Sequence, residues 1–184
     1  KSYFDIHGIK YEKYMLDYDR QLIPHCKEIE YEKRKNIVDL INIYDGKFNK
    51  IGMKIGKSNP LSKSWYEDKR KKNRSIFSQL KNNTENYFRT VTKTKSIDNM
   101  YTVFKPYCKY VKGEGYTKGF VSCNARGTNE FKNKKSLAYL INFFMSPDIK
   151  QFVEHYHIEF DDNLFSLSAL LQWIWRSQIR DGKS

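Results

Sequence analysis

Three side chains near the end of the sequence have the types and the spacing to bind a phosphate. Gln172, Arg176 and Arg180 follow one another at intervals of four residues. On a helix, at 100° per residue, this spacing forms a narrow stripe. Arginine matches the geometry of a phosphate better than lysine does. We therefore expect the stripe to face an anion rather than the core of its own domain.

The neighbouring residues predict the helix that would carry this stripe. Asp162 or Asn163 can cap its start, and Gly182 can end it. Trp173 is predicted near the stripe, where an aromatic side chain suits a docking surface. The alternative is an ordinary solvated face. The apolar side expected to face the core consists of Leu164, Leu167, Leu171, Ile174 and Trp175.

A second polar group follows a predicted strand in the stretch "SCNARGTNEF", residues 122–131. Asn124, Arg126, Thr128 and Asn129 crowd a glycine turn there. Small and polar residues at the end of a strand are where α/β sheets build ligand sites. An ordinary polar turn is the alternative, and the stretch alone does not decide between the two.

These two motifs together resemble motifs V and VI of superfamily 2 helicases of the DEAD/DEAH-box type. The strings "NMYTVFKPY", "GYTKGFVSCNARGTNEF", "LAYLINFFMSP" and "LFSLSALLQWIWRSQIRDG" are similar to the C-terminal region of helicase-like proteins from phages and mobile elements. The resemblance runs from Asn49 to the end. It implies a second RecA-like domain, with ATP held between it and a first RecA-like domain of the same full-length chain.

The resemblance also implies a role for each residue. Arg176 and Arg180 would be arginine fingers on the γ-phosphate, and Gln172 would orient the helix or the nucleotide. Arg126, Thr128 and Asn129 would couple the nucleic-acid backbone to the ATP site. The usual motif VI has the spacing Q-x-x-x-R-x-x-R, and its second step is one residue wider here.

The elements that bind ATP directly are not found in this sequence. The stretch "GMKIGKS", residues 52–58, has three residues between its glycines, whereas a phosphate loop needs four. A DEAD-like acidic box is also missing. We therefore expect ATP and Mg²⁺ to be bound mainly by a missing domain, and the chain alone not to hydrolyse ATP.

The charge of the chain is concentrated in its central third. Residues 61–135 contain 18 Lys/Arg and 6 Asp/Glu, out of 34 and 21 in the whole chain, whose net charge is +13. Such a block favours DNA or RNA as the partner, and a lysine-rich solvated surface is the alternative. A basic module that binds DNA or a protein without ATP chemistry is the second functional hypothesis. The candidate contacts outside the loop are Arg70, Lys71, Lys72, Arg74 and Lys105.

The stretch "EHYHIEFDD", residues 154–162, supports a third and weaker hypothesis, a metal-dependent nuclease. A His-x-His pair beside carboxylates can bind a metal, although surface histidines at a helix end are the favoured interpretation, and we assign no metal site. Cys26, Cys108 and Cys123 are far apart, which predicts free thiols in a reducing compartment, here the cytoplasm.

Helical and strand patterns alternate along the chain, which predicts an α/β class with a RecA-like sheet and flanking helices. We expect a helical lead-in over residues 1–48 and the RecA-like domain over 49–184. No apolar run approaches the ~18 residues of a membrane span, so we expect no membrane partner. The first residue is Lys1, which suggests a piece of a longer protein. Helices are predicted over 11–23, from Pro24 to Asp45, over 61–83, 147–156 and the final stretch, and strands over 49–58, 87–94, 99–104 and from 119, while 136–145 is buried in either state.

Overall fold

The computed structural model describes residues 4, 7–53, 59–125, 129–158 and 160–184. Its centre is a small parallel sheet of β3 (Asn99–Thr102) and β4 (Ser136–Tyr139). The strands pair in register from Asn99 opposite Ser136 to Thr102 opposite Tyr139. A parallel bridge between Tyr101 and Phe120 brings a third extended segment to the other edge of β3. The predicted α/β class is confirmed.

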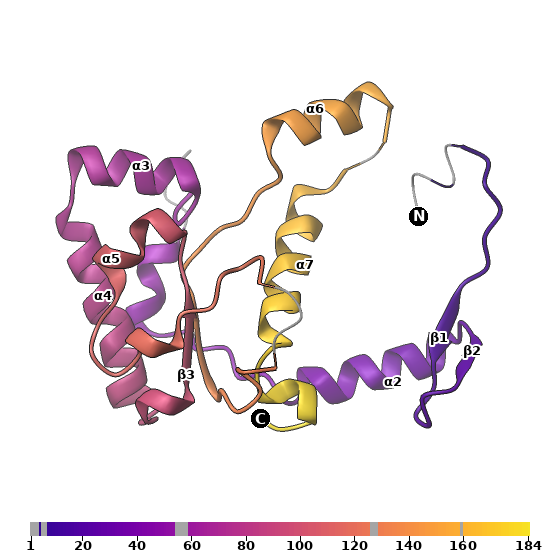
Figure 1. Cartoon of the computed structure of the whole chain (residues 1–184), viewed down its shortest axis with the longest axis horizontal. Coiled ribbons are helices and arrows are strands. Elements are labelled where there is room, and N and C mark those ends of the chain that lie inside the picture. The colour runs from indigo at the N-terminus through magenta and orange to yellow at the C-terminus, as the bar shows by residue number, and fades with distance from the viewer. Residues whose placement is uncertain (1–3, 5–6, 54–58, 126–128, 159) are drawn as a thin grey trace.

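One face of the sheet is covered by α3 (Lys63–Lys72), α4 (Ser75–Asn86) and α5 (Cys108–Val111), as Figure 1 shows. Tyr66, Phe77 and Tyr107 stack on one another there, with ring centroids 4.9 to 6.1 Å apart. The Tyr66 hydroxyl donates to the carbonyl of Leu140 at 2.6 Å and so ties this layer to the chain just after β4. The helix predicted over 61–83 is confirmed in outline, and Asn73 divides it in two.

The other face of the sheet is covered by α7 (Asp162–Ile174). Its contact with the sheet is made by Trp173, which is fully buried against Met100 and Val121. The indole N–H of Trp173 donates to the carbonyl of Val121 at 3.1 Å. A sheet with helices on both faces gives the three layers of an α/β domain.

The N-terminal segment corrects one prediction. The helix expected over 11–23 is wrong, because the chain forms a hairpin of β1 (Tyr14–Leu16) and β2 (Leu22–Pro24). The Asp17 carboxylate accepts from the backbone N–H groups of Asp19 and Gln21, which closes the turn. The next helix, α2 (Lys27–Val38), confirms the second predicted helix but ends earlier. Figure 1 shows α2 and the hairpin extending away from the sheet.

Two predicted strands are also replaced by helical turns. Residues 87–94 continue α4 as a π-helical turn, η2 (Tyr87–Val91), and the first half of the stretch 49–58 lies in η1 (Lys47–Gly52). Residues 54–58 lie outside the described residues. The remaining elements are the short turns η3 (Ser96–Asp98), η4 (Lys105–Tyr107), η5 (Thr117–Gly119) and η6 (Gln178–Asp181), and the helix α6 (Pro147–His155).

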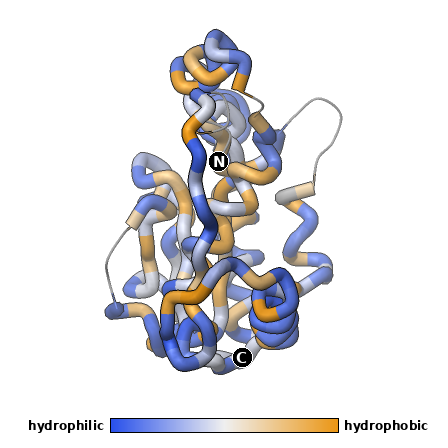
Figure 2. Tube along the Cα trace, turned by 90° about the vertical axis from the view of Figure 1, so that its right-hand side faces the viewer, coloured by the Kyte–Doolittle hydropathy of each residue, from blue (hydrophilic) through white to orange (hydrophobic). Residues whose placement is uncertain are grey.

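Helix α6 lies at the top of the molecule in Figures 1 and 2, where apolar and polar residues alternate along it. Ile149 and Phe152 of this helix are exposed. In the described part of the chain, none of the helices combines the length and the apolar character needed to cross a bilayer.

Candidate nucleic-acid interface

The basic block predicted from the sequence lies on the last turn of α3 and just beyond it. Arg70, Lys71, Lys72 and Arg74 are all exposed. Cations at this end of a helix also complement its dipole, so part of their role is local. Four exposed positive side chains within five residues nevertheless create a concentrated positive surface.

Asp68 is the carboxylate that pairs with this block in the described structure. It contacts Lys72 at 2.7 Å and Lys69 at 3.8 Å. The hydrogen bond between Asp68 and Lys72 lowers the pKa of the carboxyl group and raises the pKa of the ammonium group. Since one carboxylate serves the whole block, the net charge of the surface remains strongly positive.

A second basic group lies on the neighbouring turn and helix, η4 and α5. Lys105, Lys109 and Lys112 are exposed there, and the Lys109 ammonium lies 5.1 Å from the centroid of the Tyr110 ring. Spacings of four and three residues place side chains on one helix face. Lys109 and Lys112 were missed in the sequence because residues 99–116 were interpreted as strand and loop.

The two basic groups lie on one layer. Burial and the charge of Glu67 raise the pKa of Tyr107, whereas the nearby guanidinium of Arg70 lowers it, which places Arg70 close to η4. Helices α3, α4 and α5 cover the same face of the sheet. We call the surface formed by Lys69–Lys72, Arg74, Lys105, Lys109 and Lys112 the basic face.

The loop that resembles motif V lies beyond the third extended segment, as predicted. Cys123 is half-buried, and burial raises the pKa of its thiol. The Ser122 hydroxyl donates to the side chain of the exposed Asn124 at 2.5 Å. Arg126 and Thr128 lie outside the described residues. Asn129 is exposed at the far end of the loop.

The predicted stripe on the last helix is wrong. Helix α7 ends at Ile174, so Arg176 and Arg180 do not continue the helix face of Gln172. The chain turns away because the backbone N–H of Gln178 donates to the carbonyl of Lys134, next to β4. Arg180 lies instead on η6 and donates from Nη1 to Asn129 Oδ1 at 2.5 Å. Two predicted site residues from distant parts of the sequence are thus brought together.

The other two residues of the stripe have different surroundings. Gln172 is exposed and donates weakly to Ser168 at 3.4 Å. Arg176 is half-buried, and its Nε is buried without a hydrogen-bond partner in the described structure. The three side chains therefore form no common anion site.

The predicted core side of this helix is also wrong. Trp175 and Leu171 were expected to be buried, yet they are 44% and 48% exposed. Trp173, expected near the exposed stripe, is the residue that contacts the sheet. Leu164 and Leu167 are exposed as well, which leaves an apolar strip along α7.

The carboxylates of the 154–162 stretch serve the helices around them. Asp161 caps α7, accepting from the backbone N–H groups of Asn163 and Leu164 at 2.8 and 3.1 Å, and Asp162 pairs with Lys150 at 2.6 Å. No cluster of three or more His, Cys, Asp or Glu side chains suited to a metal is found among the described residues. The three cysteines are free thiols, which confirms that prediction, and all three are half-buried.

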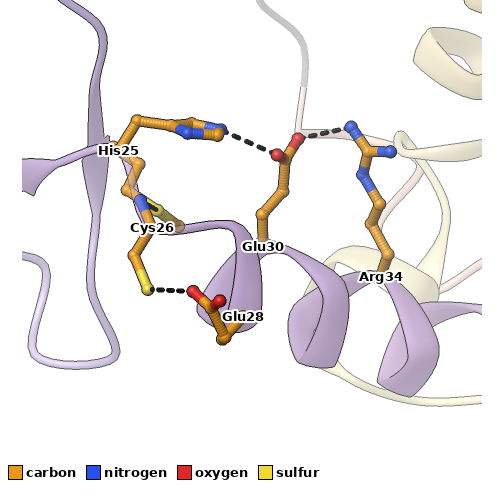
Figure 3. Close-up of polar contacts among 6 residues, drawn as sticks. His25, Cys26, Glu28, Glu30 and Arg34 are labelled. Carbon is orange, nitrogen blue, oxygen red and sulfur yellow. Dashed lines mark hydrogen bonds and ion pairs between the residues drawn. The ribbon is translucent and has the colours of Figure 1, made fainter.

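A polar network that the sequence analysis missed joins the hairpin to α2. His25 Nε2 lies 2.8 Å from the Glu30 carboxylate, which also pairs with Arg34, and the Cys26 thiol donates to Glu28 at 3.1 Å (Figure 3). The hydrogen bond with His25 lowers the pKa of Glu30. The i,i+4 spacing of Glu30 and Arg34 was the signal available in the sequence.

Comparison with known proteins gives a family. The family described as "YonV C-terminal Rossmann-like domain" matches residues 35–184. The chain belongs to this family. The YonV C-terminal Rossmann-like description agrees with the α/β sheet, and it does not mention a helicase.

A curated relative of the YonV family supports this assignment. The "SPbeta prophage-derived uncharacterized protein YonV" of Bacillus subtilis (strain 168) is 40% identical over 186 residues. The match covers the whole of this chain and 44% of that relative, so the chain spans less than half of the relative's length. The prophage origin of the relative agrees with the expected likeness to phage proteins. No solved structure matches the chain significantly.

Proposed function

We propose that this YonV-family domain binds nucleic acid through the basic face. The observation that supports the proposal is the concentration of cations on α3, η4 and α5 around the single carboxylate of Asp68. Each phosphate that the face neutralises releases a condensed counterion, so affinity depends steeply on salt. Tyr110, beside Lys109, adds an aromatic ring at the same surface.

The test removes three charges from the basic face by Arg70→Gln, Lys71→Gln and Arg74→Gln. None of these side chains takes part in an ion pair found in the described structure. The matched control removes three exposed charges from the hairpin and α2, by Lys13→Gln, Lys27→Gln and Lys35→Gln. Binding to labelled single- and double-stranded oligonucleotides is measured by fluorescence anisotropy across a series of salt concentrations.

The triple variant of the basic face should bind at least about tenfold more weakly than the control at low salt. Its plot of log affinity against log salt should be shallower by roughly three contacts' worth of slope. Equal losses in the two variants would mean that only total charge matters, and affinity independent of salt would contradict phosphate binding altogether.

A motor role is the second candidate, and the hydrogen bond between Arg180 and Asn129 supports it. In such a motor, this contact would couple the loop to the C-terminal turn, and ATP and Mg²⁺ would be bound by a domain outside this chain. The test is nucleic-acid-stimulated ATP hydrolysis by the longer Bacillus relative. Loss of activity on replacing the equivalents of Arg176 and Arg180 would support the motor. An absence of ATP hydrolysis in the intact relative would exclude it.

A further inference from the structure

A cavity of about 490 Å³ runs along one edge of β4. Leu137 and Tyr139 line it from one face of the sheet, and Ala138 and Leu140 line it from the other. Side chains on opposite faces of a strand can border the same space only at the strand's edge. In the described structure β4 pairs with β3 alone, so this edge is free.

The free edge presents backbone polar groups to an apolar space. Leu140 donates its N–H to Thr102 of β3 at 3.0 Å. In a parallel ladder, alternate residues bond to the same side, which turns the N–H and C=O groups of Leu137 and Tyr139 toward the cavity. An occupant that satisfies such groups must itself have main-chain amides, as an added β-strand does.

The two helix layers extend past this edge and form the walls of the cavity. Leu80 and Tyr87 line it from the α4 side, and Leu167 and Leu171 line it from α7. The space thus lies between the layers, in the plane of the sheet, where the next strand of an α/β sheet would lie. We call it the strand slot.

The same chain has a strand pair without a partner. The β1–β2 hairpin exposes large apolar side chains, with Leu16 53% and Leu22 69% exposed, and no residue of α2 is buried. An isolated two-stranded hairpin is marginally stable in water. Figure 1 shows the hairpin at the end of α2, away from the sheet, and no described residue before Leu40 lines the strand slot.

The charges near the two surfaces are complementary. Three lysines precede β4 closely, at 132, 134 and 135, while residues 11–24 of the hairpin contain three carboxylates and two cations. Opposite charges favour this pairing over contact between two slots. The three-residue strands of the hairpin are also close in length to the four-residue β4.

We infer that the chain forms a dimer by arm exchange, in which the hairpin of each copy adds to the free edge of β4 in the other. The exchange covers the exposed hairpin side chains and fills both strand slots under one two-fold axis. It adds main-chain hydrogen bonds to the Leu137 and Tyr139 edge without disturbing the basic face.

The oligomeric state is measured by sedimentation velocity over a range of protein concentrations. The wild-type chain should change from monomer to dimer with concentration. Leu22→Asp in the hairpin and Leu171→Asp in the slot should each raise the dimer dissociation constant at least about tenfold. The matched control is Ile97→Asp, a 74% exposed apolar residue outside both surfaces, which should leave the dimer unchanged. Circular dichroism checks that each variant is folded.

A mixing experiment tests which surfaces meet. The Leu22→Asp chain keeps an intact slot and the Leu171→Asp chain keeps an intact hairpin, so an equimolar mixture should form a heterodimer through one exchanged arm. A mixture that stays monomeric would show that hairpin contacts hairpin or slot contacts slot, which overturns the inference. A wild-type chain that is monomeric at every concentration would overturn it as well.

Discussion

Trp173 joins the last helix to the sheet. Its ring packs against Tyr139 with the centroids 5.3 Å apart, and its indole N–H bonds to the carbonyl of Val121. Trp175, two residues away, is 44% exposed and makes no such contact. The two residues have the same chemistry and opposite surroundings, which makes them a matched pair for testing the packing of α7.

Trp173→Ala should lower the free energy of unfolding by about 3–5 kcal/mol, because it opens a large cavity against the sheet. Trp175→Ala should change it by no more than about 1 kcal/mol. Urea denaturation followed by circular dichroism measures both.

Trp173→Phe provides a milder variant in case the alanine variant does not fold. It keeps an aromatic ring but loses the donor to Val121, so its effect should lie between the other two. Equal destabilisation by the two alanine variants would contradict the observed orientation of α7.

At the scale of elements, the ends of α7 decide where its functional side chains lie. Asp161 starts the helix by accepting two backbone N–H groups. Its end is set by the chain that follows, since Ser177 and Gln178 are buried beside the segment before β4. Arg176 and Arg180 leave the helix for that reason, and Arg180 meets Asn129 instead of Gln172.

Asp161→Ala should destabilise the protein by about 1 kcal/mol, because it removes the acceptor for two N–H groups at the helix start. Asp161→Asn keeps an oxygen acceptor and should have a much smaller effect. The midpoint of urea denaturation, at an unchanged slope, is the measurement. Identical midpoints for the two variants would show that the cap contributes little.

At the scale of the whole molecule, the protein consists of a three-layer body and an arm. The family match begins at residue 35, inside α2, so the hairpin and most of that helix lie outside the matched domain. None of the residues of α2 is buried. The body, in contrast, contains two clusters of buried side chains, one on each face of the sheet.

Deletion of residues 1–34 should therefore leave a body that unfolds cooperatively. At low protein concentration, where dimers are few, its free energy of unfolding should match that of the full chain to within about 1 kcal/mol. Loss of a cooperative transition would show that the arm is part of the folding unit. The same deletion should remove the concentration dependence of the melting temperature, because it removes the exchanged hairpin.

Local signals in the sequence determined several features of the protein. The α/β class followed from alternating helical and strand patterns, the basic block on α3 from a run of like charges, and the start of α7 from its capping residues. These features depend on neighbours in the sequence, so a single chain is enough to read them. The hairpin was misread as a helix because its turn depends on the side chain of Asp17 rather than on a glycine.

Only the tertiary structure decided which tryptophan of the last helix is buried, where that helix ends, and that β4 has a free edge beside an apolar slot. Each of these depends on contacts between distant segments, such as Trp173 with Val121 and Gln178 with Lys134. The helical periodicity of 162–175 marks an apolar side but contains no information on which side meets the sheet. The sheet selected Trp173, because a single large side chain with a donor could fill the space above β3 and bond to an adjacent carbonyl.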